Sequence, residues 1–274
     1  MESNQHIGKI SVMGIVNLTA DSFYAGSRVL SPDGSFDAGL FLDKVDSMLS
    51  EGADILDLGA CSTRPGSDSV GEEEEWSRLK PALEILGSER PGTRLSIDTF
   101  RPGIVSRAFD IVGPFIVNDV SGGPDGMLRE VGGLGLEYVA MHTRGTPRDM
   151  QSLTDYDDVT EAVRGFFSVF SERADAFGIK DWILDPGFGF AKTVDQNYEL
   201  LRNLSAFGEF GREVLVGISR KSMICKPLGI TPEEALSATS ALHLEALRGG
   251  ASILRVHDVA AAVQVVGLYR HLIR

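Results

Sequence analysis

Short apolar runs alternate with longer amphipathic stretches along the chain. The short runs are rich in Val, Ile and Leu without a clean apolar–polar alternation, which is typical of parallel strands buried on both faces. We predict strands at Ile10–Val16, Ala53–Leu58, Arg94–Ile97, Phe115–Val117, Leu136–Met141, Trp182–Leu184, Val214–Ile218 and Ser252–Val256. We predict helices between them, most clearly at Val159–Phe177, Gln196–Leu204, Glu233–Arg248 and Val259–Leu272.

Two of the predicted helices have local start signals. Thr231 offers an N-cap, Pro232 fits the first helical position and Glu234 supplies a carboxylate at the third. The run Glu72–Glu75 also opens a helix. We expect these four acids to form a solvated first turn that the helix dipole favours, without a functional role.

Eight strand–helix units indicate a single (β/α)8 TIM barrel, a fold that typically needs ~250 residues. The chain has 274 residues. A doubly wound open sheet is the alternative, and the number of strands alone does not exclude it. Because no linker or shift in composition divides the sequence, we predict one domain over residues 1–274.

Composition narrows the class of partner. The net charge of −13 argues against nucleic acid or an anionic membrane, but a small anionic substrate depends only on local charge. No apolar run approaches the ~20 residues of a membrane span. The start of the chain lacks the apolar stretch of a signal peptide, so we expect a cytoplasmic protein. Two cysteines, Cys61 and Cys225, form neither a disulfide framework nor a zinc site, and we expect both to be packing residues.

Polar residues follow every predicted strand. In chain order they are Asn17, Ser62-Thr63-Arg64-Pro65, Asp98, Asn118-Asp119, His142-Thr143-Arg144, Asp185, Ser219-Arg220-Lys221 and Arg255-Val256-His257. In a parallel barrel the carboxyl ends of the strands converge on one face, where barrel active sites are built. We therefore predict the active site at the C-terminal ends of the strands.

Each of these residues also has an ordinary structural interpretation, since an Asn or Asp after a strand is often a helix cap. We interpret His142 as a satisfied core histidine. Asp119 follows Asn118 directly and should point the opposite way, so we interpret it as structural. Asp57 lies inside a predicted strand, and we leave it out of the site as a residue that ties loops together. Polar residues after all eight predicted strands are much harder to explain as separate coincidences than a single one would be.

The set separates into hydrogen-bond acceptors or amides and cations. The first group is Asp98, Asn118 and Asp185; the cations are Arg64, Lys221 and Arg255, with His257 as a further candidate. Such a site suits a ligand with a donor-rich polar heterocycle at one end and an anion at the other. Because Arg255 and His257 are two positions apart in an extended segment, both face the same way and suit a phosphate.

Two partial nucleotide motifs are rejected. Gly187-Phe188-Gly189 lacks the third glycine and the trailing acidic residue of a dinucleotide fingerprint. Ala191-Lys192-Thr193 ends like a P-loop, but that motif needs glycine where Pro186 and Ala191 stand.

The ordered strand-end motifs resemble those of the dihydropteroate synthases over nearly the whole chain. The resemblance rests on Met13–Thr19 with Asp21-Ser22-Phe23, Ser62–Gly66, Ser96–Thr99, Asn118–Gly122, Met141-His142, Arg144–Pro147, Asp185–Phe190, Ser219–Ser222 and Arg255–His257. Four departures are Ala20 in place of a usual proline, Tyr24-Ala25-Gly26-Ser27 in place of a Ser-Asp-Gly-Gly-like stretch, Cys61 in place of a common Glu, and Thr143 in place of a common Met. None of them removes a residue with an assigned chemical role.

The resemblance implies a folate-biosynthesis transferase, a sulfonamide target, that condenses a dihydropterin diphosphate with 4-aminobenzoate and releases diphosphate. It implies pterin contacts at Asp98, Asn118, Asp185 and Lys221, and diphosphate contacts at Asn17, Thr63, Arg255 and His257. It implies an aminobenzoate pocket of Arg64, Pro65, Phe190 and Ser222, with Asp98, Lys221 and Arg255 as catalytic residues. Mg²⁺ would be held through Asn17, and a homodimer is expected.

Two rival functions remain open. A pterin-binding methyltransferase barrel would share the pterin contacts but need no diphosphate site, so the Ser-Arg-Lys and Arg-x-His motifs count against it. A catalytically inactive pterin-binding paralogue is the second rival, and the intact residues at every assigned position argue against it. We further expect the first loop, Leu18 to Leu30, to close over the diphosphate, because Ala20 lacks the proline ring that would restrict it.

Overall fold

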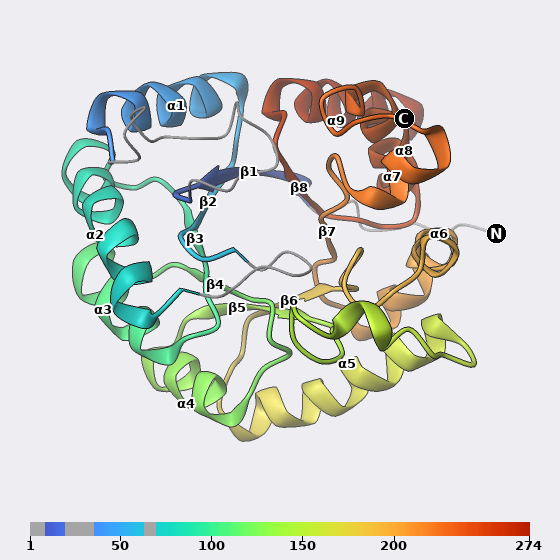
Figure 1. Ribbon diagram of the computed structural model, residues 1–274, viewed down its shortest axis with the longest axis horizontal. Helices are drawn as coiled ribbons and strands as arrows, with labels where there is room; N and C mark the ends of the chain where they lie inside the picture. Colours follow the sequence, from blue (N-terminus) through green and yellow to red (C-terminus); the bar gives the residue numbers. More distant parts are fainter. Residues whose placement is uncertain (1–8, 20–35, 63–69) are drawn as a thin grey trace.

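The structure, a computed structural model, describes residues 9–19, 36–62 and 70–274. Within these residues eight parallel strands form one sheet in the order β6-β5-β4-β3-β2-β1-β8-β7. The strands surround the centre of the molecule and the helices form an outer ring (Figure 1). A bridge between Leu184 and Val214 joins the two edge strands. The predicted barrel is therefore confirmed, and the open doubly wound sheet is excluded.

The strands end close to the predicted positions. They are β1 (Ser11–Asn17), β2 (Ile55–Gly59), β3 (Leu95–Asp98), β4 (Ile116–Asp119), β5 (Glu137–Met141), β6 (Trp182–Asp185), β7 (Leu215–Val216) and β8 (Ile253–Val256). The α-helices are α1 (Ala38–Glu51), α2 (Glu72–Glu89), α3 (Pro102–Val112), α4 (Asp125–Leu134), α5 (Val159–Ala176), α6 (Val194–Arg202), α7 (Ser222–Leu228), α8 (Leu236–Arg248) and α9 (Val259–Leu272). Two 3-10 helices are η2 (Met150–Ser152) and η3 (Leu204–Phe210).

An apolar layer fills the lower part of the barrel and supports the site above it. Seven strand side chains form a buried cluster apart from the main core: Met13, Ile55, Ile116, Val139, Ile183, Leu215 and Ile253. Side chains two positions further along a strand point to the same face. The next inward layer therefore contains Asp57, Asn118, Asp185 and Arg255, so the barrel interior turns from apolar to polar toward the carboxyl ends of its strands.

Two predictions about helix starts were wrong in part. Glu75 is fully buried and pairs with Arg101, while Thr99 Oγ1 donates to Glu75 Oε1 at 2.6 Å. The last acid of the run therefore links α2 to the end of β3 rather than facing solvent. The backbone N–H of Thr231 does donate to the Glu234 carboxylate at 2.9 Å. However, α8 begins only at Leu236.

Among the described residues, no helix is both long and apolar enough to cross a membrane.

Candidate active site

A cavity of about 330 Å³ opens at the carboxyl ends of the strands. Its size falls at the low end of the range for small-molecule sites. Side chains from β1, β3 and β8 line it, together with the segments that follow β2, β6 and β7. Gly217 also lines it, and a Cβ there would approach Arg255 Cβ and Lys221 Nζ at 3.9 and 4.0 Å. The missing side chain therefore leaves room for a ligand beside these two cations.

The predicted acceptors lie at the carboxyl ends of their strands, and one of them, Asp98, lines this cavity. The buried Oδ1 atom of Asp98 has no hydrogen-bond partner among the described residues. Asn118 and Asp185 are buried on β4 and β6. Asp185 Oδ1 accepts a 2.8 Å hydrogen bond from the backbone N–H of Gly187. A buried carboxylate oxygen without a donor is costly, so Asp98 is set to receive a donor from a ligand.

Asp57, which we left out of the site, contacts two residues that we assigned to it. It is fully buried and accepts from Arg255 Nε at 2.7 Å and from Ser96 Oγ at 2.6 Å. Asn118 Nδ2 donates to its two carboxylate oxygens at 3.3 and 3.2 Å. Its two-residue offset from Ile55 was the sequence signal, since that spacing places Asp57 inside the barrel.

Arg255 connects the two carboxylates. Its Nη2 atom lies 2.6 Å from Asp57 Oδ2 and 2.8 Å from Asp98 Oδ2. Burial disfavours the Arg255 cation, but the two carboxylates outweigh that effect and raise its pKa. Burial raises the pKa of Asp98 to about 7, with Arg255 lowering it and Asp57 raising it. Burial also raises the pKa of Asp185, against the opposing effect of Lys221.

Lys221 is the second cation of the pocket. Its Nζ donates to Phe188 O at 2.6 Å and lies 5.0 Å from the centre of the Phe190 ring. Burial lowers its pKa to about 8, with Asp185 opposing that shift. The predicted pterin residues Asp98, Asp185 and Lys221 are thus electrostatically coupled.

His257 lies beside Arg255 on the cavity wall, as their spacing predicted. Its Nδ1 atom is 3.0 Å from Ser219 Oγ. Burial, and then the charge of Arg255, lowers the pKa of His257 to about 3. Burial and the neighbouring guanidinium therefore favour the neutral form of His257, whose ring N–H can donate to an anion. Asn17, at the end of β1, lines the same cavity.

The predicted aminobenzoate residues are only partly described. Phe190 and Ser222 line the cavity, with Ser222 as the exposed first residue of α7. Thr63, Arg64 and Pro65 lie outside the described residues, as does most of the first loop. Both cysteines are free thiols: Cys61 is buried and Cys225 packs against the core, as expected of packing residues, and both also line the cavity.

Lys192, which we rejected as part of a P-loop, holds the segment that carries Phe190. Its buried Nζ donates to Gly187 O and Phe190 O at 3.0 Å each and lies 2.9 Å from His142 Nδ1. Burial lowers the pKa of Lys192 to about 7 and that of His142 to about 2. The interpretation of His142 as a core histidine is confirmed.

Asp119 is structural, as predicted. Its Oδ2 atom accepts from Tyr138 Oη at 2.6 Å, and its Oδ1 atom accepts from the Ser121 hydroxyl at 2.6 Å. It therefore faces the helical layer rather than the cavity.

Comparison with known proteins agrees with this geometry. Residues 13–257 match the family model described as pterin binding enzyme. The dihydropteroate synthase of Escherichia coli K12 is 39% identical over 258 residues, which cover 93% of this chain and 89% of that protein. The enzyme of the same name from Synechocystis is 40% identical over 260 residues, covering 93% and 87%.

Solved structures give the same result. The Yersinia pestis dihydropteroate synthase with a sulfonamide drug complex has a TM-score of 0.88 and 36% identity, covering 97% of this chain and 95% of that one. The Thermus thermophilus enzyme in complex with 4-aminobenzoate has a TM-score of 0.85 and 35% identity, with the same coverage. This chain therefore belongs to the pterin binding enzyme family, as a transferase of the dihydropteroate synthase group.

Proposed function

We propose that this protein condenses (7,8-dihydropterin-6-yl)methyl diphosphate with 4-aminobenzoate to give 7,8-dihydropteroate and diphosphate. The observation that carries the proposal is the unpartnered Asp98 oxygen beside Lys221 and Arg255 in one cavity. Structures of the Thermus thermophilus enzyme with 4-aminobenzoate and with 6HMPPP support this choice of ligands.

The pterin ring would occupy the base of the cavity. Its adjacent ring N–H and exocyclic amine are two parallel donors that match the carboxylate of Asp185. Asn118 and Lys221 would meet the remaining polar ring atoms. A hydrogen-bond donor of the ligand would also pair with Asp98 Oδ1, and this new hydrogen bond would favour binding.

The diphosphate would lie between Asn17, Arg255 and His257, with Thr63 as a further predicted contact. Among the described residues, no group of three or more His, Cys, Asp or Glu side chains could hold a metal ion. The amide oxygen of Asn17 suits a hard cation that keeps phosphate and water oxygens as its other ligands. Bound there, Mg²⁺ would reduce the negative charge of the diphosphate.

The residues of the chain would then favour cleavage of the C–O bond to the diphosphate. Arg255 and the neutral His257 would donate to the departing oxygens, whose charge grows in the transition state. Asp98 would stabilise the methylene cation left on the pterin. The arylamine is a weak nucleophile, so its placement by Phe190 and Ser222, with the predicted Arg64 and Pro65, matters more than a general base.

Diphosphate release tests the proposal. We expect release only when both substrates are present, and we expect it to stop in excess chelator and return with Mg²⁺. Each substrate alone is the matched control. Release that continues unchanged in chelator would refute the role of Mg²⁺. Pterin-dependent methyl transfer without diphosphate would favour the methyltransferase rival, and pterin binding without any turnover would favour the inactive paralogue.

We also propose a homodimer, which sedimentation would test.

A further inference from the structure

The segment that carries Lys221 has little support from the sheet. Strand β7 has two residues, and its ladder with β8 contains the pairs Leu215–Ile253 and Val216–Leu254. The predicted site residues after β7 start only at Ser219, and those of the β8 segment continue to His257, beyond the paired residues of the two strands. Some interaction other than strand pairing must therefore fix the two segments relative to each other.

Two side-chain pairs extend the contact beyond the strands. In the first, Ser219 Oγ lies 3.0 Å from His257 Nδ1 and accepts from the His257 backbone N–H at 3.3 Å. In the second, Arg220 Nε and Nη2 each bond Asp258 at 2.8 Å. Consecutive residues on one segment thus pair with consecutive residues on the other. We refer to these two pairs as the β7–β8 side-chain ladder.

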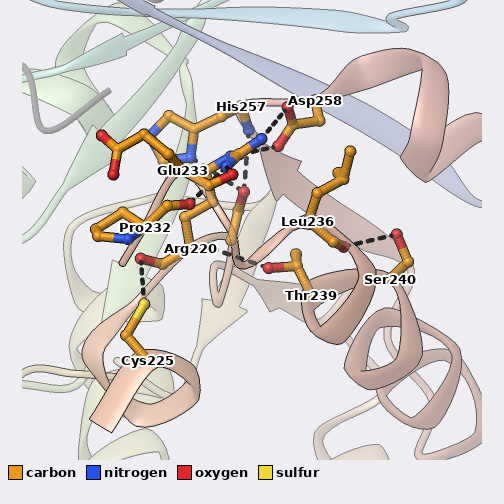
Figure 2. Close-up of polar contacts among 10 residues, drawn as sticks. Arg220, Cys225, Pro232, Glu233, Leu236, Thr239, Ser240, His257 and Asp258 are labelled. Carbon is orange, nitrogen blue, oxygen red and sulfur yellow. Dashed lines mark hydrogen bonds and ion pairs between the residues drawn. The ribbon is translucent and has the colours of Figure 1, made fainter. Parts of the chain in front are cut away.

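Arg220 also reaches the connection between α7 and α8. Its Nη1 atom donates to Glu233 O at 2.9 Å and to Pro232 O, and its backbone N–H bonds Thr239 Oγ1 at 3.2 Å. Figure 2 shows the Arg220 side chain among Pro232, Glu233 and Asp258. Because Pro232 lines the cavity, the guanidinium ties one cavity wall to the end of β8.

The backbone of Arg220 is held in an unusual conformation. Its φ is +56°, in the left-handed region that residues with a side chain rarely adopt. Such a conformation persists when surrounding contacts determine it, and it often marks a functional site. Here the left-handed turn lies at the cavity wall, which Arg220 and Lys221 both line, and the Arg220 side chain is buried.

We propose that Arg220 is a positioning residue, whose pairing with Asp258 sets Lys221 and Ser222 in register with Arg255 and His257. The inference rests on the proposed function, since it assigns both segments to one reaction. Displacement of a reacting group by about 1 Å commonly costs on the order of 100-fold in rate. Arg220 itself lines the cavity, but its guanidinium is held by Asp258 and by the carbonyl groups of Pro232 and Glu233. Loss of the guanidinium should therefore lower kcat/KM through the displacement of Lys221 and Ser222.

Two variants test the pair. Arg220→Ala removes the fork, and we expect a loss of about 100-fold in kcat/KM. Asp258→Asn keeps the volume, and asparagine suits the N-cap position that Asp258 holds on α9, so this variant should fold even if Arg220→Ala does not. It should lose about tenfold, because the amide keeps only one of the two acceptor oxygens and carries no charge. Guanidinium chloride, below the concentration that unfolds wild type, should partly restore kcat/KM in Arg220→Ala.

The matched control is Arg164→Ala. Arg164 makes the same two-bond fork to Glu209, at 2.7 Å for each bond, on an exposed surface between α5 and η3. This variant should keep kcat/KM. Folded Arg220→Ala and Asp258→Asn enzymes that both stay within about threefold of wild type would overturn the proposal. So would an Arg220→Ala enzyme that guanidinium does not restore. If the wild-type enzyme shows no turnover, the proposed function fails instead. Calorimetry with a pterin then tests the positioning role of Arg220, and unchanged pterin affinity in Arg220→Ala would overturn it.

Discussion

Asp57→Asn tests whether a residue that need not touch substrate organises the site. The substitution keeps the shape of the side chain but removes its charge and one acceptor. Asp57 accepts hydrogen bonds from Arg255, Ser96 and Asn118. An amide group would present N–H hydrogens to at least one of these donors, so a buried donor loses its partner.

The magnitude follows from the contacts. Breaking a buried ion pair by removing one member typically costs about 3–5 kcal/mol. Arg255 keeps its 2.8 Å bond to Asp98, and the new amide oxygen still accepts one bond, so we expect the lower end, about 3 kcal/mol. A protein of this size should then unfold about 5–10 °C lower.

The same substitution should change the protonation of Asp98. The charge of Asp57 is one cause that raises the pKa of Asp98 to about 7. Without it, Arg255 has a single carboxylate partner, and the pKa of Asp98 should fall. Pterin affinity should decrease, because Asn118 and Arg255 lose a shared anchor, and any remaining affinity should persist to lower pH than in wild type.

Thermal unfolding and calorimetry with a pterin measure these effects, with Asp119→Asn as the matched control. Asp119 is equally buried at a strand end but bonds Tyr138 and Ser121, away from the cavity. Its variant should lose stability yet keep pterin affinity. If Asp57→Asn bound pterin as tightly as Asp119→Asn, Asp57 would be a structural residue only, and the reasoning would be refuted.

Three further predictions concern the residues of the cavity. Asp185→Asn and Lys221→Ala should weaken pterin binding in calorimetry while circular dichroism stays native, because each leaves polar ligand atoms unpaired; near wild-type affinity in both would displace the pterin site. Arg255→Ala should lower kcat by roughly 100–1000-fold, since its partner charge grows as diphosphate departs; a tenfold or smaller loss in steady-state assays would move the anion site elsewhere. For a pterin without phosphate, affinity should fall below about pH 7, as Asp98 gains a proton, and above about pH 8, as Lys221 loses one; a flat profile across this range would exclude these charge states from binding.

Local patterns were sufficient for the barrel and for most of its site. Helix α9 begins and ends where its apolar pattern predicts, since periodicity and capping are local properties. The polar residues after each strand also pointed to one face, because parallel strands present their carboxyl ends together. The structural role of Asp119 followed in the same way from its position directly after Asn118.

Tertiary structure alone decided how these residues act on one another. Asp57 and Arg255 are 198 positions apart, and only closure of the barrel places them in contact. Arg220 and Asp258 meet because β7 and β8 are neighbouring parallel strands, and their contact lies beyond the point where strand pairing stops. The pKa values of Asp98, Lys221 and His257 likewise depend on burial and on charges from other strands. The sequence by itself therefore determined the barrel and the strand ends that carry the polar residues, whereas packing of the eight strands around one axis determined their partners and their charge.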